Sequence, residues 1–317
     1  MSLFYENILG AIGNTPLVKL SNISKGSGIN IYAKIEYYNP GLSIKDRVAI
    51  KFIEEAEKSG KIKSGGTVIE RTSGNMGTGL AIVCAVKGYK FIAVMSEGNS
   101  VERSRMLSAL GAEVVLVPQA PGGKPGFVSG EDLDLVEIKT KELAKKLNAY
   151  RPDQFNNPDG AKAHEETTGQ EIWSQTEGKI DAFVAYVGSG GSFVGTSRAL
   201  KNHSKNVKCF VVEPETAPYL AGKKITSTRH RIQGGGYAFK PPFWDDSLVD
   251  GYLIVSDGEA LASARDLAGK EGIFAGYSSG ANIAASLKAA ELLGKGSNVV
   301  TILPDSGLKY LSTDLFT

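Results

Sequence analysis

The chain has 317 residues, of which 42% are hydrophobic and 22% charged, values typical of a globular protein with a sizeable core. Its 36 basic and 34 acidic residues are dispersed and leave a net charge of +2, which excludes the basic stripe of a nucleic-acid-binding protein. It has no run of ~18 apolar residues, which argues against a membrane-spanning helix.

The cysteines indicate core packing and not a disulfide framework, and the histidines argue against a metal centre. Cys84 stands in an apolar run and Cys209 in the strand-like segment VKCFVV, so we expect two buried thiols in a reducing, cytoplasmic protein. His164, His203 and His230 are far apart in the sequence, which argues against a metal site. The N-terminal segment has neither the basic region nor the apolar stretch of a signal peptide.

Strand-like and helix-like segments alternate along the first part of the chain. Apolar residues at helical spacing predict a helix over 43–60, with Ser43 as its N-cap and Gly60 at its end. The other segments expected up to residue 118 are strands at 29–36, 67–70, 91–97 and 113–118 and helices at 75–88 and 100–111.

The alternation continues after a segment rich in Gly and Pro, residues 119–130, which predicts neither helix nor strand. Beyond it we expect helices at 131–147, 163–175, 258–270 and 278–293, a helix that starts at 192, and strands at 182–188, 207–214 and 298–307. Such Val/Ile-rich strands between helices are typical of parallel sheets that are buried on both faces. The sequence therefore predicts an α/β protein of two lobes that join near residue 150.

Ligands of α/β proteins bind beyond the carboxyl ends of the strands, and the loop 187–193 (VGSGGSF) has suitable chemistry there. Its glycines let backbone N–H groups approach a ligand at a helix N-terminus, which favours a single phosphate over an ordinary tight turn. Phe193 replaces the third glycine of a dinucleotide fingerprint, and no Walker A sequence follows. The candidate phosphate ligands are Gly188, Ser189, Gly190, Gly191 and Ser192.

Three further positions at strand ends carry candidate chemistry. The loop 72–77 (TSGNMG) offers hydroxyls and an amide that suit a carboxylate, with an N-cap role for Ser73 as the alternative. Lys45 falls in a first helical turn, where a positive charge is disfavoured, so its position indicates a neutral amine or a Schiff base unless it is merely solvated. Ser306 could hydrogen-bond a ring nitrogen or belong to an ordinary turn.

Six motifs in a fixed order carry a family resemblance. They are IGNTPLVKL (12–20), NPGLSIKDR (39–47), ERTSGNMGTGLA (70–81), QFNNP (154–158), GSGGS (188–192) and PDSG (304–307). Together they resemble the motifs of the cysteine synthase (O-acetylserine sulfhydrylase) and cystathionine β-synthase family, whose members are fold-type II pyridoxal-phosphate (PLP) enzymes. The motifs extend over nearly the whole chain.

The resemblance implies a tryptophan synthase β-like fold of two domains, each a mostly parallel sheet flanked by helices. A larger domain, residues 1–40 and 151–317, would anchor the cofactor, and a smaller domain, residues 41–150, would be mobile. A homodimer is implied as well.

The resemblance also implies roles for the candidate residues. Lys45 would carry PLP as a Schiff base and move the substrate's α-proton. Asn75 would hydrogen-bond the ring hydroxyl of PLP, Ser306 would face the ring nitrogen, and the loop 188–192 would bind the phosphate. The substrate carboxylate would contact Thr72, Ser73, Asn75 and Gln154.

The implied reaction is β-replacement on an L-serine derivative or L-cysteine through an aminoacrylate, to which sulfide or a thiol adds. An alternative is a cysteine lyase, or a lanthionine- or cystathionine-forming enzyme, that releases hydrogen sulfide or water. A serine/threonine dehydratase usually resembles SFKxRGA, whereas this chain has SIKDRVA at 43–49. A non-catalytic binding protein on the same fold would be expected to lack Lys45.

Three positions depart from the family pattern. Met76 stands where relatives typically have Thr, and Gly235 stands where they have a branched aliphatic residue. Tyr237 is shared with the cystathionine β-synthase pattern. Met76 removes one possible donor near the carboxylate and adds apolar bulk. We interpret Gly235 and Tyr237 as an enlarged substrate pocket for a nucleophile bulkier than sulfide, such as cysteine or homocysteine. The loop 119–130 looks longer than is typical, and it either borders the active-site entrance or is a surface excursion.

Overall fold

The computed structural model describes residues 4–123 and 128–317, and these divide into two compact units. The three-stranded unit contains residues 4–12, 44–123 and 128–159, and the six-stranded unit contains residues 13–43 and 160–317. Both are built on parallel or mostly parallel sheets with helices, so the predicted α/β fold class is confirmed. The predicted mobile and cofactor-anchoring roles of domains 41–150 and 1–40 with 151–317 stay predictions.

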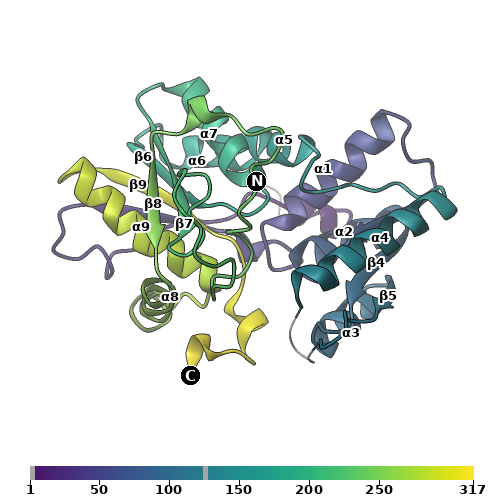
Figure 1. Cartoon of the computed structure of the whole chain (residues 1–317). Helices are drawn as coiled ribbons and strands as arrows, with labels where there is room; N and C mark the ends of the chain where they lie inside the picture. Colours follow the sequence, from purple (N-terminus) through teal and green to yellow (C-terminus); the bar gives the residue numbers. More distant parts are fainter. Residues whose placement is uncertain (1–3, 124–127) are drawn as a thin grey trace. The chain divides into compact units, whose positions relative to one another are not determined.

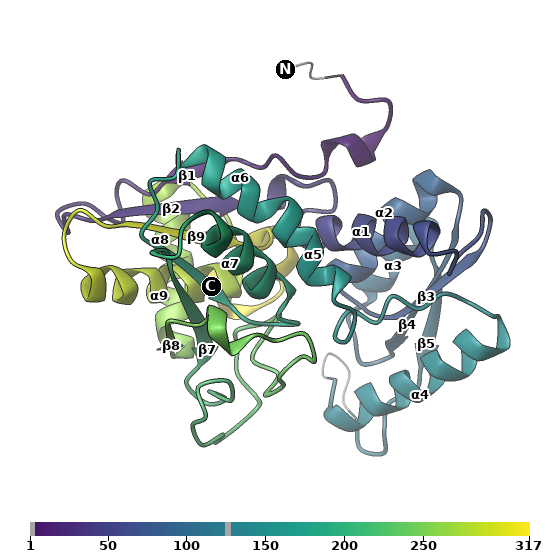
Figure 2. The same ribbon diagram turned by 90° about the horizontal axis from the view of Figure 1, so that it is seen from above.

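The sheet of the three-stranded unit is parallel throughout, in the order β3-β4-β5. Figure 2 shows α1 and α2 on one face of this sheet and α4 on the other. Val136 of α4 packs on Ile69 and Val94 of the strands. The elements are η1 (Ile8–Ala11), α1 (Lys45–Lys58), β3 (Thr67–Arg71), α2 (Asn75–Lys87), β4 (Lys90–Ser96), α3 (Val101–Ala109), β5 (Glu113–Val117) and α4 (Gly130–Lys146).

The sheet of the six-stranded unit has the order β1-β2-β9-β6-β7-β8, in which only β1 is antiparallel to its neighbour. Figure 1 shows α9 beside the strands β8 and β9. Its strands are β1 (Leu17–Lys19), β2 (Asn30–Ile35), β6 (Ala182–Tyr186), β7 (Lys208–Pro214), β8 (Gly251–Val255) and β9 (Asn298–Leu303). Its α-helices are α5 (Asp159–Glu166), α6 (Thr168–Gln175), α7 (Gly191–His203), α8 (Asp257–Glu271) and α9 (Tyr277–Leu293). Its 3₁₀ helices are η2 (Glu36–Tyr38), η3 (Asp246–Leu248), η4 (Gly307–Tyr310) and η5 (Asp314–Phe316).

Helices cover both faces of this second sheet, as the side chains of β6 show. Val184 lies in one apolar cluster with Ala281 and Ala285 of α9. The adjacent Phe183 instead stacks on Phe193 of α7, with ring centroids 6.4 Å apart. Successive side chains of a strand point to opposite faces, so α9 and α7 lie on opposite sides of β6.

The neighbouring strands β6 and β9 separate toward their carboxyl ends. Their paired residues run from Ala182 to Val184 on β6 and no further. Beyond that point the Asn282 side chain, on α9, hydrogen-bonds the backbone of both strands. Its Oδ1 accepts from the Tyr186 N–H at 2.6 Å, and its Nδ2 donates to the Ile302 carbonyl at 2.7 Å. A buried amide therefore satisfies the backbone of both strands where they diverge.

The two cysteines are buried and free, as predicted. Burial raises the pKa of the Cys84 thiol to about 12 and that of Cys209 to about 11. Both thiols are therefore protonated and unreactive at neutral pH, which confirms their interpretation as core residues.

Two predicted helices are described differently by the structure. The helix expected over 163–175 is two helices that break at Thr167, whose φ of −123° is not helical. The Thr167 hydroxyl donates to the Ala163 carbonyl at 2.6 Å, and such a bond bends helices. The prediction of Ser43 as an N-cap is wrong as well, because α1 begins at Lys45 and its N-cap residue is Ile44. Ser43 instead forms an antiparallel β-bridge with Asp305.

The sequence analysis missed strands β1 and β8, which are the two edges of the six-stranded sheet. β1 has three residues and none is buried, while in β8 only Leu253 and Val255 are buried. Edge strands that are half-exposed lack the continuous apolar run that marks a central parallel strand. Of the predicted loop 119–130, residues 124–127 lie outside the described residues, and both interpretations of this loop stay open.

We expect Asn282→Ala to lower the free energy of unfolding by about 2–4 kcal/mol, because it leaves the Tyr186 N–H and the Ile302 carbonyl buried without their partner, at ~1–3 kcal/mol for each group. Urea unfolding measures the change. Ser286→Ala, one turn further along α9, is the control, since the Ser286 hydroxyl only donates to the Asn282 carbonyl within the helix. Equal stability of the two variants would contradict the role assigned to Asn282.

Candidate functional site

The glycine-rich loop 188–192 follows β6 and leads directly into α7, as predicted. Gly190 is the N-cap residue of α7 with a left-handed φ of 87°, and no side chain caps the helix. The first N–H groups of a helix have no acceptor within the helix, and the helix dipole makes this end positive. A Cβ at Gly188 would overlap the Gly234 carbonyl oxygen, so the backbone itself forms the loop surface. This arrangement suits a compact phosphate.

Ser306 follows β9, the strand adjacent to β6. Its side chain is buried, and its Oγ accepts a hydrogen bond of 3.2 Å from the Leu308 N–H. A hydroxyl both accepts and donates, so this contact leaves the Ser306 proton for an acceptor such as a ring nitrogen. The structure therefore brings Ser306 and the loop 188–192 to the carboxyl ends of two neighbouring strands of one sheet.

The segment that carries Gly235 and Tyr237 lies beside the glycine loop, but it does not enlarge a pocket at Gly235. A Cβ at Gly235 would overlap the ring of Tyr186 and the Val187 carbonyl oxygen. The space of the missing side chain is therefore filled by Tyr186, and the predicted enlarged pocket is wrong at this position. Burial raises the pKa of the Tyr186 hydroxyl well above its usual range, and this hydroxyl donates to the Ile232 carbonyl at 3.0 Å. Tyr237 is 51% exposed.

In the three-stranded unit, Thr72 and Ser73 lie in the loop between β3 and α2. The buried Thr72 hydroxyl accepts a hydrogen bond of 2.9 Å from the Gly77 N–H in the first turn of α2. The N-cap residue is Gly74, so the alternative role of Ser73 as N-cap is wrong. Ser73 Oγ instead accepts a hydrogen bond of 3.3 Å from Arg103 of α3, a residue that the sequence analysis missed. Its guanidinium adds positive charge beside a loop predicted to hold a carboxylate.

Lys45 and Asn75 are the first residues of α1 and α2, respectively. The two helices approach closely, because a Cβ at Gly79 would lie 3.2 Å from the Lys45 carbonyl oxygen and 3.0 Å from Ala49. The fold thus brings the N-terminal turns with Lys45 and Asn75 side by side. Met76, the residue after Asn75, is buried at 3% exposure.

Gln154 lies in a loop that is tied to β3. Its neighbour Asp153 has a left-handed φ of 53°, and the Asp153 N–H donates to the carboxylate of Glu70 at 2.7 Å. Glu70 is buried at 2% exposure and stands two residues before Thr72. The sequence analysis missed Glu70, although a single carboxylate inside the apolar strand at 67–71 was a visible signal.

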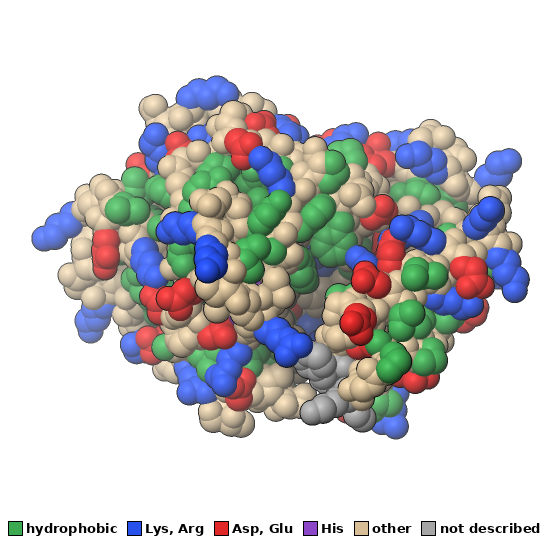
Figure 3. Space-filling view, viewed as in Figure 1, with side chains coloured by type: hydrophobic (Ala, Val, Ile, Leu, Met, Phe, Trp, Pro, Cys, Tyr) green, Lys and Arg blue, Asp and Glu red, His purple; other side chains and the backbone are tan. Residues whose placement is uncertain are grey.

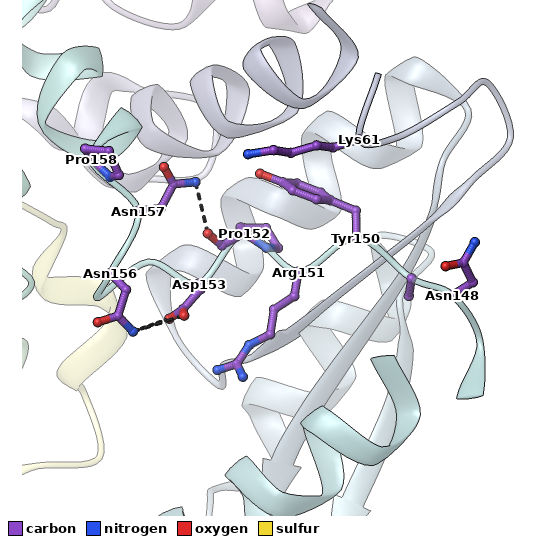
Figure 4. Close-up of a pocket in the computed structure, with 10 residues that line it drawn as sticks. Lys61, Asn148, Tyr150, Arg151, Pro152, Asp153, Asn156, Asn157 and Pro158 are labelled. Carbon is purple, nitrogen blue, oxygen red and sulfur yellow. Dashed lines mark hydrogen bonds between the residues drawn. The ribbon is translucent and has the colours of Figure 1, made fainter. Parts of the chain in front are cut away.

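A cavity of about 560 Å³ in the three-stranded unit is lined by Lys61 and by residues between 148 and 158 (Figure 4). Figure 4 shows the Lys61 side chain beside the ring of Tyr150, and the side chains of Asn156 and Asn157 bonded back to their own loop. The lining consists of Lys61, Asn148, Ala149, Tyr150, Arg151, Pro152, Asp153, Asn156, Asn157 and Pro158. Among these described residues, none is a predicted site residue.

Comparison with known proteins decides the family. Residues 8–305 match the family model described as pyridoxal-phosphate dependent enzyme. The chain belongs to this PLP enzyme family. PLP is therefore its cofactor, and the resemblance seen in the six motifs is confirmed.

Individual relatives of this PLP enzyme are similar over almost their whole length. A cysteine synthase of Staphylococcus aureus strain Mu50 is 44% identical over 313 residues, which cover 98% of this chain and 97% of the relative. The structure of O-acetylserine sulfhydrylase isoform 3 from Entamoeba histolytica has 38% identity and a TM-score of 0.91, with 99% of this chain and 92% of that chain covered. A hydrogen sulfide-producing enzyme from Fusobacterium nucleatum has 41% identity and a TM-score of 0.89, with 98% and 99% covered.

The residues of the PLP enzyme fit the chemistry of its cofactor. A helix N-terminus without a side-chain cap, preceded by glycines, matches a phosphate group. The buried Ser306 hydroxyl can donate a hydrogen bond to a pyridine nitrogen. Lys45 has the primary amine that can react with the aldehyde carbon of PLP. The individual roles of these residues stay predictions.

Charges are mixed over the surface of the protein. On the face shown in Figure 3, basic and acidic side chains are interspersed. In the part of the chain that the structure describes, no helix combines the length and apolar character needed to cross a bilayer. Within residues 4–123 and 128–317, no three His, Cys, Asp or Glu side chains gather so that they could hold a metal ion.

We expect Gly235→Ala to lower the free energy of unfolding by about 1–3 kcal/mol, since an added methyl group overlaps Tyr186 and the backbone of Val187. Thermal or urea unfolding of the purified protein measures this change. Gly258→Ala in α8 is the matched control, because nothing lies within 4 Å of a Cβ there, and alanine should stabilise the helix by up to ~1 kcal/mol. A Gly235→Ala variant as stable as the wild type would contradict the close packing described above.

Proposed function

We propose that this chain is a PLP-dependent β-replacement enzyme that acts on an L-serine derivative or L-cysteine and uses sulfide or a thiol as the nucleophile. The observation that carries the proposal is the 44% identity to a cysteine synthase over 98% of the chain. The loops at the strand ends of both units support it. The loop 188–192 offers N–H donors for a phosphate, and the loop 72–76 offers donors for the substrate carboxylate.

In the six-stranded unit, the loop 188–192 binds the phosphate of PLP through backbone N–H groups and the hydroxyls of Ser189 and Ser192. Ser306 donates to the ring nitrogen from the end of the adjacent strand. A neutral serine keeps this nitrogen less positive than a carboxylate partner would, which moderates electron withdrawal.

In the three-stranded unit, Lys45 holds PLP covalently through Nζ, and Asn75 hydrogen-bonds the ring hydroxyl. Ser43 forms a β-bridge with Asp305, the neighbour of Ser306, and Lys45 follows Ser43 by two residues along the chain. This connectivity supports a role for Lys45 and Ser306 on the same cofactor.

The substrate carboxylate contacts the loop 72–76 and Gln154. The Thr72 hydroxyl, the Asn75 amide and the N-terminus of α2 supply donors for a carboxylate, and the adjacent Met76 is buried. Arg103, which donates a hydrogen bond to the Ser73 hydroxyl, adds a positive charge that strengthens the preference of this loop for an anion.

PLP, when bound, supplies an electron-withdrawing group at the α-carbon of the amino acid. The Nζ atom of Lys45, as a free amine, would remove the proton from this α-carbon. The same Nζ returns a proton to the α-carbon after the nucleophile has added at the β-carbon. The chain's own contribution is thus a base at a fixed position and two anion sites that orient the substrate.

A lyase reaction on cysteine that releases hydrogen sulfide is the second candidate. It is favoured by the 41% identity to a hydrogen sulfide-producing enzyme over 98% of this chain. The same residues perform both reactions, since only the leaving group and the nucleophile differ. Hydrogen sulfide release from L-cysteine, compared with cysteine formation from O-acetyl-L-serine and sulfide, separates the two.

We also propose a cytoplasmic homodimer. The two free, buried thiols support a reducing compartment. Phe4, Tyr5 and Ile8 near the N-terminus are 80%, 46% and 50% exposed, and such apolar side chains favour burial against a second copy.

We expect Lys45→Ala to abolish the visible absorbance of the covalently bound cofactor and to reduce kcat by at least ~10³-fold, since it removes both the attachment and the base. Absorbance spectra and steady-state rates measure the two effects. Lys61→Ala is the control, because Lys61 is an exposed lysine of the same unit and should leave both unchanged. A Lys45→Ala protein with the wild-type spectrum would contradict the assignment of Lys45.

A further inference from the structure

A single buried carboxylate links the two segments to which we assign the substrate carboxylate. Glu70 is on β3, two residues before Thr72, and its Oε1 accepts from the Arg71 N–H at 2.9 Å. Its Oε2 accepts from the Asp153 N–H at 2.7 Å, 83 residues further along the chain. Gln154 follows Asp153 directly, so one side chain connects the base of the loop 72–76 to the base of the Gln154 loop.

The Gln154 loop turns around the residue that Glu70 holds. Asp153 has a φ of 53°, a conformation that costs energy for a residue other than glycine. Its carbonyl oxygen accepts from the N–H groups of Asn156 and Asn157, both at 3.0 Å. The Asn156 side chain donates to the Asp153 carboxylate, also at 3.0 Å. The conformation of this loop therefore depends on the position of Asp153.

Charged neighbours hold Glu70 in turn. Arg151 Nε lies 3.5 Å from Glu70 Oε1, while its two Nη atoms donate to both carboxylate oxygens of Glu137 at 2.8 and 2.7 Å. Burial raises the pKa of Glu70 to about 7, although Arg151 and the two N–H donors lower it. The Glu137 carboxylate is less buried, and Arg151 lowers its pKa to about 2. Burying Glu70 is thus costly, and three specific partners offset that cost.

We propose that Glu70 is a positioning residue that sets the distance between the loop 72–76 and Gln154, and thereby the affinity for the carboxylate of the amino-acid substrate. The inference rests on the proposed function, which places the substrate carboxylate at these two segments. Glu70 itself contacts neither substrate nor cofactor. Its loss should weaken amino-acid binding and leave the chemical step at saturation nearly unchanged.

A carboxylate is needed because two N–H donors on different segments each require an oxygen. Glutamine has the same length but only one oxygen acceptor, so Glu70→Gln must release either the Arg71 or the Asp153 N–H. Glu70→Asp keeps both oxygens and the charge opposite Arg151, but it is one methylene shorter and cannot span the same distance. Glu70→Gln therefore tests the need for the charge and the second oxygen, and Glu70→Asp tests the need for the length of the side chain.

The test is a spectral titration of the holoprotein with O-acetyl-L-serine, combined with kcat and KM in the presence of saturating sulfide. We expect both Glu70→Gln and Glu70→Asp to raise the half-saturating amino-acid concentration and KM about 10- to 100-fold, with a far smaller change in kcat. The cofactor absorbance before substrate addition should equal that of the wild type. If Glu70→Gln does not fold, Glu70→Asp decides alone, since it keeps a negative charge opposite Arg151.

Glu137→Gln is the matched control, because Glu137 also pairs with Arg151, and with Arg71, whereas the Asp153 N–H donates to Glu70. It should change stability and leave the half-saturating concentration as in the wild type. Unchanged half-saturation in both Glu70 variants, or an equal rise in Glu137→Gln, would overturn the inference. A wild-type holoprotein whose spectrum does not respond to any serine derivative or to cysteine would instead overturn the proposed function.

Discussion

The separation of β6 from β9 at their carboxyl ends is the constraint on which the cofactor-binding side of this enzyme depends. Two parallel strands in full register would leave no room between the loops that follow them. Here the ladder stops at Val184, and the Asn282 amide bonds the backbone of both strands beyond that point. The loop 188–192 and Ser306 follow these two separated strand ends, so one sheet places the residues proposed for the phosphate and for the ring nitrogen beside each other.

In the three-stranded unit, the Glu70 carboxylate bonds the backbone of two separate segments. The substrate-binding candidates of this unit come from two segments that are far apart in the sequence, and Glu70 holds the backbone of both. Asn282 and Glu70 are thus buried polar side chains that bond main-chain groups at strand ends. Both are costly in an apolar interior, and each is offset by hydrogen bonds with specific partners. Rigid placement of this kind holds the main chain that carries the proposed site residues in a fixed position.

Local sequence patterns predicted the strand–loop–helix segments that carry the site. The glycines at 188–191 and the position of Lys45 at a helix start were visible because their chemistry depends on neighbours in the chain. The carboxylate of Glu70 was visible inside a predicted strand, but its role could not be predicted, because that role depends on a hydrogen bond from the Asp153 N–H, 83 residues away. The enlarged pocket at Gly235 was wrong for the same reason, since the side chain that fills the space, Tyr186, belongs to β6, whereas Gly235 lies in a loop far along the chain. Packing partners of this kind are properties of the fold, which a single sequence does not display.

The central claim is that the enzyme replaces a substituent at the β-carbon of an amino acid. Incubation of the purified holoprotein with O-acetyl-L-serine and isotopically labelled sulfide, followed by mass spectrometry of the products, tests it most directly. β-Replacement predicts labelled L-cysteine in amounts that match the acetate released. Release of acetate with pyruvate and ammonia, and no label in cysteine, would contradict it.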